Sequence, residues 1–284
     1  MGAQLRVAVA ASVLLLGMPH GALDFTLSGL VGARRTWASG LAFLGVYAAL
    51  GALVVGAWQV APSPTLVAFL LLSVVHFGLA DVASRPDRPV AKVLLRGSIP
   101  IVVPLAWHPV ETGELLALLA ETDRGATVEA LDACGPWMLC ALVIGTVWVA
   151  LRESGPTRPS IGRALIEPLA LGSIFVFATP LVAFTVYFCG WHSTRHLDAA
   201  RRWLTGSHAP PRGPVLLEAG AIWLAAIGLI LVLGSFVGDP ASLDLDETVL
   251  RAMFIGLGAL TLPHVLLVDG RVRPMLERRL GRAH

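Results

Sequence analysis

The chain has 284 residues, of which 56% are hydrophobic and only 14% are charged, and its mean hydropathy is +0.75. Soluble domains carry about 25% charged residues, and surface-to-volume scaling limits how much apolar surface a chain of this length can bury. The composition therefore excludes a soluble enzyme, a disordered chain and a nucleic-acid-binding protein. The net charge of +2 decides nothing, because membrane proteins sort their charges by side.

Long, continuous apolar runs predict membrane-spanning helices, because a helix of about 20 apolar residues crosses the hydrocarbon core with its backbone satisfied. The stretch 163–205 is too long for one span, and Pro180 divides it, since proline lacks an amide donor and disfavours helix at the preceding residue. We therefore predict an all-α, polytopic membrane helix bundle, a single catalytic domain over residues 1–284. Its nine predicted spans are 5–30, 36–58, 64–83, 91–107, 134–151, 163–178, 181–205, 214–237 and 248–269.

The distribution of charge predicts the orientation of these spans. Of the 21 Lys and Arg residues, seventeen follow odd-numbered spans or lie in the C-terminal tail. Most of the acidic residues lie on the opposite side, many of them in the stretch 108–133, which we expect to be an external loop with one or two surface helices. Because basic residues are enriched on the cytoplasmic side, we predict a multi-pass protein of the cell membrane with an external N-terminus and a cytoplasmic C-terminus.

The first predicted span has some features of a signal peptide, namely a basic residue, an apolar run and small residues. Its apolar run continues to Leu30 and contains the pair Pro19 and His20. We therefore expect this segment to be retained as a membrane span.

Five of the eight histidines fall inside predicted spans, where ionisable side chains are costly and by default mark a functional site. An aspartate follows on the same helix in each case, within the motifs MPHGALD, VHFGLAD, GWHSTRHLD and LPHVLLVD. The other three, His108, His208 and His284, lie in loops or at the terminus and are expected to be solvated. The five intramembrane histidines are His20, His76, His192, His196 and His264.

These five histidines are predicted to lie at one depth in the membrane. They occur on spans one, three, seven and nine, which all run in the same direction, and each lies roughly 12 to 17 residues from the outer end of its span. His192 and His196 are four residues apart, so both imidazoles lie on one helix face. Neutral imidazole is the commonest biological metal ligand. The pattern predicts an intramembrane metal centre, and an all-imidazole ligand set suits iron, copper, zinc or nickel.

The aspartates of these motifs are candidates to accept hydrogen bonds from the ligand histidines, which would fix the tautomer and orientation of each ring. They lie toward the C-terminal ends of their helices, where the helix dipole disfavours anions, so we expect a cationic partner and propose Arg195. Pro19 and Pro263 directly precede histidines, and each predicts a local kink. The aspartates concerned are Asp24, Asp81 and Asp269.

Taken together, the four motifs resemble the Brp/Blh (bacteriorhodopsin-related-protein-like) family of β-carotene 15,15′-dioxygenases. The resemblance extends from near the N-terminus to near the C-terminus, although the intervening spans match in hydropathy alone. It implies a non-haem Fe(II) enzyme that uses O₂ to cleave β-carotene into two molecules of all-trans-retinal, the chromophore of microbial rhodopsins. Carried over by motif, His20, His76, His192 and His196 resemble the iron ligands. His264 then has a less certain role, either as a further ligand or as a group that orients one.

The physical properties of this substrate agree with the predicted site. β-Carotene is an apolar rod about as long as a bilayer is thick, so a metal near the midplane could meet its central bond. Aromatic side chains could line a substrate tunnel, although each of them also fits ordinary packing. These residues are Phe77, Phe184, Tyr187, Phe188 and Trp191.

Two other functions remain open on the residues alone. One is a different histidine-rich membrane oxygenase or hydroxylase that acts on lipid, but such di-iron sites use about eight histidines in several boxes, and this chain has one HxxxH pair. The other is an intramembrane metal or proton transporter, which would also place His and Asp inside spans. That function predicts a polar path to both faces, and few polar residues lie in the spans outside the histidine layer.

Overall fold

The computed structural model describes residues 2–82, 89–154, 160–205, 213–237 and 244–280, and throughout these ranges the secondary structure is helical, with no strand. This confirms the predicted all-α class. The chain forms two compact units, which are described separately below. Unit 1 comprises Met1–Thr65 and Cys189–His284, and unit 2 comprises Leu66–Phe188. The prediction of a single domain stays a prediction.

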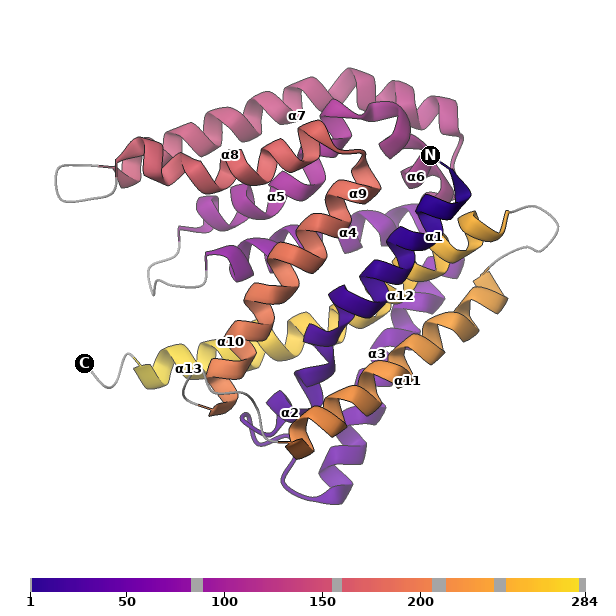
Figure 1. Cartoon of the computed structure of the whole chain (residues 1–284), viewed down its shortest axis with the longest axis vertical. Helices are drawn as coiled ribbons and strands as arrows, with labels where there is room; N and C mark the ends of the chain where they lie inside the picture. Colours follow the sequence, from indigo (N-terminus) through magenta and orange to yellow (C-terminus); the bar gives the residue numbers. More distant parts are fainter. Residues whose placement is uncertain (1, 83–88, 155–159, 206–212, 238–243, 281–284) are drawn as a thin grey trace. The chain divides into compact units, whose positions relative to one another are not determined.

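The helices of unit 1 are drawn in Figure 1. Irregular turns within these helices are called η1, η2 and η4; Figure 1 labels only the α-helices. The elements are α1 (Ala3–Ser12), η1 (Val13–Gly17), η2 (Met18–Leu23), α2 (Asp24–Ser28), α3 (Trp37–Val60), α10 (Ser193–Thr205), α11 (Gly213–Val237), α12 (Leu245–Leu267), η4 (Val268–Val272) and α13 (Arg273–Leu280).

Unit 2 contains the remaining helices, of which α4 begins in unit 1 and η3 ends in it. Its elements are α4 (Pro62–Asp81), α5 (Val90–Trp107), α6 (Pro109–Ala120), α7 (Arg124–Glu153), α8 (Ile161–Phe177), α9 (Pro180–Thr185) and η3 (Val186–His192).

Seven helical segments among the described residues are long and apolar enough to cross a membrane, and they correspond to seven of the nine predicted spans. The predicted span 163–178 is α8, a helix of 17 residues. The predicted span 181–205 is helical from α9 through α10, but its second half is rich in charged residues. The count of nine spans and the orientation of the termini therefore stay predictions.

One boundary differs from the prediction. We expected a loop with surface helices over 108–133 and a separate span from 134. The chain instead forms α6 and then a single helix of 30 residues, α7, which begins at Arg124. Asp123 caps this helix by accepting a hydrogen bond from the amide of Ala126 at 2.8 Å. The acidic residues lower the hydropathy of this stretch without breaking the helix.

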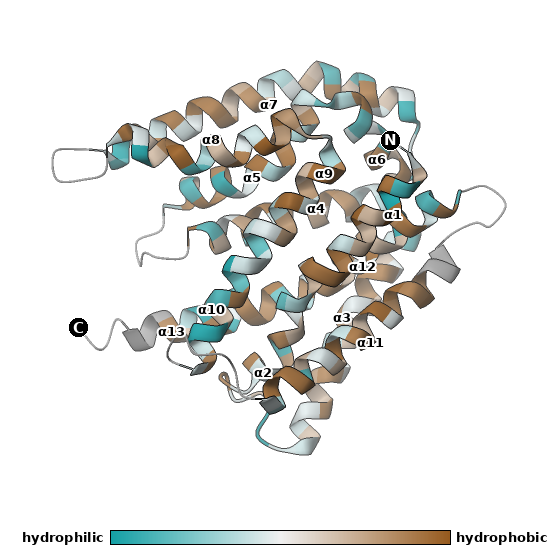
Figure 2. Ribbon diagram, in the orientation of Figure 1, coloured by the Kyte–Doolittle hydropathy of each residue, from teal (hydrophilic) through white to brown (hydrophobic). Residues whose placement is uncertain are grey.

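In unit 1, α12 forms the interior and packs against α1, α3 and α11. Most of α12 is buried, whereas α3 and α11, which are strongly apolar, have few fully buried residues and many exposed ones. In the ribbon of Figure 2, brown, apolar positions recur along α11, and an 18-residue stretch of this helix has a mean hydropathy of 2.4. A large exposed apolar surface of this kind matches a lipid environment.

Irregular helical turns occur in unit 1 where it approaches its histidines. η1 and η4 are π-helical, η2 is a 3₁₀ turn, and the π-helical η3 ends at His192. Side chains from other helices form hydrogen bonds with backbone carbonyl groups in and beside η1. Cys189 Sγ lies 3.5 Å from the carbonyl oxygen of Ser12, and Trp223 Nε1 donates to the carbonyl oxygen of Leu14 at 2.9 Å. Such bonds satisfy backbone groups that water cannot reach.

The prolines behave differently from one another. Pro19 lies inside the 3₁₀ turn η2, so the regular α-helix is interrupted there. The helix α12 continues α-helical through Pro263 and changes to π-helix at Val268.

In unit 2, α5 packs against α6, α7 and α8, and it crosses α4 at two glycines. A Cβ atom on Gly97 would lie 1.7 Å from the Val74 carbonyl oxygen, and one on Gly78 would lie 1.9 Å from that of Val93. No side chain fits at either position, so the two backbones are in direct contact. This crossing fixes the helix turn next to His76.

Candidate metal centre

Four buried histidines of unit 1 come together in one cluster, which we call the histidine cluster: His20, His192, His196 and His264. The ring centroid of His20 lies 5.2 Å from that of His192, 5.1 Å from that of His196 and 5.3 Å from that of His264. The His196 and His264 centroids are 4.8 Å apart. The cluster thus joins residues from η2, from the η3–α10 junction and from α12, and the common depth of the five histidines in a membrane stays a prediction.

His20 is oriented by the backbone of its own irregular turn. Its Nδ1 lies 2.5 Å from the Gly17 carbonyl oxygen and 3.1 Å from Ser193 Oγ, and Ser193 Oγ donates to the same carbonyl at 2.8 Å. A carbonyl oxygen can only accept, so Nδ1 of His20 carries the proton. The lone pair of a neutral His20 ring is therefore on Nε2.

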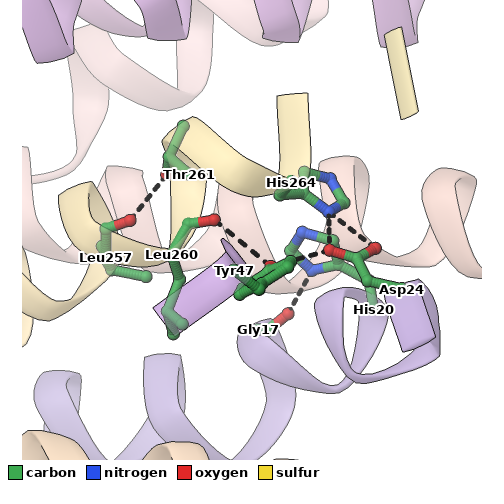
Figure 3. Close-up of polar contacts among 8 residues, drawn as sticks. All are labelled: Gly17, His20, Asp24, Tyr47, Leu257, Leu260, Thr261 and His264. Carbon is green, nitrogen blue, oxygen red and sulfur yellow. Dashed lines mark hydrogen bonds and ion pairs between the residues drawn. The ribbon is translucent and has the colours of Figure 1, made fainter. Parts of the chain in front are cut away.

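His264 is oriented by a carboxylate. Its Nδ1 lies 2.9 Å from Asp24 Oδ1 and 2.8 Å from Asp24 Oδ2, and Tyr47 donates its hydroxyl to Asp24 Oδ2 at 2.8 Å. Figure 3 shows Asp24 between Tyr47 and His264, with His20 beside them. Asp24 was predicted to accept a hydrogen bond from a ligand histidine. It does accept a hydrogen bond from a histidine of the cluster, but this histidine is His264 and not His20, which lies four residues before Asp24.

The donor set suits a metal ion that prefers nitrogen ligands. Imidazoles that share one ion through bonds of about 2.1 Å have ring centres roughly 4.5–5.5 Å apart, and most distances in the histidine cluster lie in this range. Metal-binding histidines commonly donate their second N–H to a carbonyl or a carboxylate, as His20 and His264 do. In the part of the chain that the structure describes, no three His, Cys, Asp or Glu side chains are already arranged to bind a metal. Rings of the cluster would therefore have to turn to become ligands.

The fifth predicted intramembrane histidine, His76, is in unit 2. It is buried on α4, with its ring centroid 6.0 Å from that of the neighbouring Phe77. Asp81, which was predicted to support it, is the last residue of α4.

Two further predicted residues have partners of their own. Asp269 accepts from Arg273 Nε at 2.9 Å, one turn along the same helix, so this buried carboxylate has a cation beside it. The Arg195 guanidinium lies 4.1 Å from the centre of the Trp191 ring. The cationic partner of Asp269 is thus Arg273, and the role expected of Arg195 stays a prediction.

Four of the five predicted tunnel residues lie in unit 2 and contact one another or Phe175. The Tyr187 ring lies 5.3 Å from Phe77 and 5.9 Å from Phe175, and Phe184 stacks on Phe188 at 5.3 Å. The name aromatic cluster is used for Phe77, Phe175, Phe184, Tyr187 and Phe188. The fifth predicted residue, Trp191, belongs to unit 1.

Sequence reasoning missed Tyr47, Ser193 and Phe175 as parts of these clusters. Tyr47 carried one usable signal, since it is one of only two tyrosines in the chain and stands in an otherwise apolar span. Ser193 lies inside a histidine motif, and its hydroxyl could have been suspected. Nothing in the sequence distinguishes Phe175 from other apolar helix residues.

Comparison with known proteins gives a consistent family. The model of the family described as beta-carotene 15,15′-dioxygenase matches residues 11–270. The chain is 29% identical over 275 residues to a protein of an uncultured marine bacterium named beta-carotene 15,15′-dioxygenase, covering 94% of each chain. It is 32% identical over 290 residues to the probable beta-carotene 15,15′-dioxygenase Blh of Halobacterium salinarum, covering 91% of this chain and 81% of that protein. No solved structure matches the chain.

Proposed function

Because the chain belongs to the beta-carotene 15,15′-dioxygenase family, we propose that it cleaves the central 15,15′ double bond of β-carotene with O₂. One molecule of β-carotene and one of O₂ give two molecules of all-trans-retinal, so each half of the broken double bond gains one oxygen atom. The relatives are named for this reaction, and both match this chain over most of its length.

The observation that best supports the proposal is the histidine cluster of unit 1. Four imidazoles are buried together, and two of them are oriented through Nδ1. Buried ionisable groups are costly in a membrane protein and by default serve a function. A purely structural role would not need four of them in one cluster.

We further propose that the cofactor is Fe(II). Its ligands would be His20, His76, His192 and His196, with His76 assigned from its sequence motif. An iron ion there would activate O₂ and bring it together with the alkene. The protein contributes the orientation of its rings through Gly17 and Asp24, and apolar helices that exclude water from the reaction.

The aromatic cluster of unit 2 is the proposed contact surface for the polyene. Flat, apolar rings offer a conjugated hydrocarbon large contact areas without polar groups to desolvate. β-Carotene dissolves in the bilayer, and the exposed apolar helices of this chain suit the same environment. We propose that the protein resides in the cell membrane with nine spans, an external N-terminus and a cytoplasmic C-terminus, and that its retinal supplies a microbial rhodopsin.

The two alternative functions, a lipid oxygenase or hydroxylase and a metal or proton transporter, gain no support from the comparisons. Both relatives are named for carotene cleavage. We therefore propose carotene cleavage alone.

The test is expression in cells that make β-carotene, followed by chromatography of the extracted pigments. We expect β-carotene to fall and all-trans-retinal to appear in about a 1:2 molar ratio, as the balanced reaction requires. Cells that lack the gene serve as the control. If the protein is folded in the membrane and no retinal forms, the proposed function is wrong.

Iron dependence is tested on the purified protein. Removal of metal by a chelator should abolish retinal formation, and Fe(II) should restore it while Zn(II) should not, because Zn(II) has no redox chemistry with O₂. Full activity after complete metal removal would contradict the proposed cofactor.

A further inference from the structure

We propose that Tyr47 and Asp24 are positioning residues that present His264 to the metal centre as an additional imidazole ligand. The inference builds on the proposed function, since it concerns the metal of the same site. It assigns a role to α3, because Tyr47 lies on this helix and acts through the carboxylate of Asp24 on α2.

The argument begins with the hydrogen bonds of Asp24. Its Oδ2 receives the Tyr47 hydroxyl at 2.8 Å, and both of its oxygens lie within 2.9 Å of His264 Nδ1. An ionised carboxylate has no proton to donate, so Nδ1 must donate. The only nitrogen of that ring with a lone pair to offer a metal ion is then Nε2.

The surroundings make this arrangement rigid. Asp24 and His264 are 2% and 4% exposed, so water cannot readily replace either partner. Tyr47 has a second acceptor at the Leu260 carbonyl oxygen, but this lies farther away, at 3.4 Å. The phenol therefore fixes one oxygen of Asp24, and the carboxylate in turn fixes the plane of the His264 ring.

The position of His264 within the histidine cluster agrees with a ligand role. Its ring centre is 4.8 Å from that of His196 and 5.3 Å from that of His20, which are distances like those between the proposed ligands themselves. His20 shows the same pattern, with Nδ1 engaged by an acceptor. In both rings the proton is therefore on Nδ1 and the lone pair on Nε2.

A simpler role for the pair of Asp24 and His264 is to fasten α12 to the N-terminal helices. That role predicts loss of stability when the pair is broken, but no change in the affinity or the ligand number of a bound metal. The two roles are therefore separated by a measurement of metal binding that does not depend on turnover.

The experiment is an anaerobic titration of the purified, metal-free protein in detergent with Co(II), whose visible absorption reports the number and kind of its ligands. The variants are Tyr47→Phe, which removes one hydroxyl, and His264→Ala, with His264→Gln as the replacement if the alanine variant does not fold. The matched control is Thr261→Val, which removes a hydroxyl that donates to the Leu257 carbonyl oxygen of its own helix, three residues before His264.

We expect Tyr47→Phe to weaken Co(II) binding about 10-fold with an unchanged spectrum, as is typical when a group that orients a ligand is lost. His264→Ala should weaken binding further and change the spectrum, and Thr261→Val should bind Co(II) like the wild type. Wild-type affinity and spectrum in a His264 variant would overturn the ligand role, as would a wild-type protein that binds no Co(II). Wild-type affinity in Tyr47→Phe would overturn the positioning role.

The outcome is distinguishable from a failure of the proposed function. If the wild-type protein forms no retinal but the variants change Co(II) binding as expected, the carotene-cleaving function is wrong and the assignment of His264 stands. If retinal forms and the variants bind Co(II) like the wild type, the carotene-cleaving function stands and the assignment of His264 is wrong.

Discussion

Ser193 donates its hydroxyl to the carbonyl oxygen of Gly17 over 2.8 Å, across 176 positions of sequence. This bond joins the first turn of α10 to the irregular turn that precedes His20. The same hydroxyl oxygen lies 3.1 Å from Nδ1 of His20, so one side chain both anchors the turn and borders the ring.

Replacement of Ser193 by Ala should therefore loosen His20 without removing a proposed ligand. We expect the free energy of unfolding to fall by about 1 kcal/mol, the usual contribution of one hydrogen bond, and retinal formation to fall several-fold. Gly17 keeps its contact with His20, which limits the loss. Thermal unfolding in detergent and a retinal assay measure the two effects. An unchanged melting temperature would show that this bond contributes nothing to stability.

Alanine substitutions of the four proposed iron ligands form the second prediction. His20→Ala, His76→Ala, His192→Ala and His196→Ala should each abolish retinal formation and lower the bound iron. Loss of a ligand should exceed the roughly 10–100-fold effect of losing a group that orients one. Chromatography of retinal and elemental analysis of the purified protein provide the measurements.

The matched control for these variants is Thr194→Ala. Thr194 is exposed, on the turn that carries His192 and His196. Its hydroxyl donates to the backbone oxygens of Gly190 and Trp191, in its own helix. It should retain wild-type activity and iron. Substantial turnover by any one of the four histidine variants would remove that residue from the ligand set.

The third prediction concerns the crossing of α4 and α5. Gly97→Ala would place a methyl group 1.7 Å from the Val74 carbonyl oxygen, so the helices must separate. We expect a loss of about 1–3 kcal/mol in stability, typical of overpacked sites, and lower activity because His76 lies next to this crossing. Gly172→Ala on α8 is the control, since nothing lies within 4 Å of its added Cβ. Equal melting temperatures for the two variants would contradict the contact.

The fourth prediction tests the aromatic cluster as the polyene surface. Phe184→Ala removes one ring of the stacked pair with Phe188. It should raise the apparent KM for β-carotene several-fold, because one aromatic contact contributes about 0.5–1.5 kcal/mol, and leave bound iron unchanged. The control is Phe177→Ala, at an 87% exposed position at the end of α8. A KM equal to that of the control would exclude Phe184 from the substrate site.

The sequence predicts how far along its helix axis each histidine lies, because the span ends and the rise of a helix determine that distance. This reasoning grouped five histidines, of which the structure brings His20, His192, His196 and His264 together in unit 1, whereas His76 lies in unit 2. The same reasoning could not predict which side chains of other helices each residue contacts, because it does not give the direction in which a residue points from its helix axis. Asp24 lies one turn after His20 in sequence, yet a 3₁₀ turn ends between them and Asp24 contacts His264, 240 positions away.

Helix ends show the same limit. Hydropathy located the apolar part of α7 but not its start at Arg124, since acidic residues are compatible with a helix outside the membrane core. Tyr47 could not be assigned a role, because its importance depends on Asp24, which accepts its hydroxyl proton, and on His264, which Asp24 contacts in turn. Hydropathy is a property of each residue alone, whereas these contacts depend on tertiary packing.

The π-helical turns make the site depend on the number of residues before it. A π turn accommodates one residue more than an α turn, and each residue of an α-helix advances the chain by about 100° around its axis. Deletion of one leucine from η1 would leave the hydropathy of the first span nearly unchanged and rotate His20 away from its partners. Substitutions among residues 14–16 should thus be tolerated far better than a change in their number. The register of this helix, counted residue by residue, is as much a part of the site as the histidine itself.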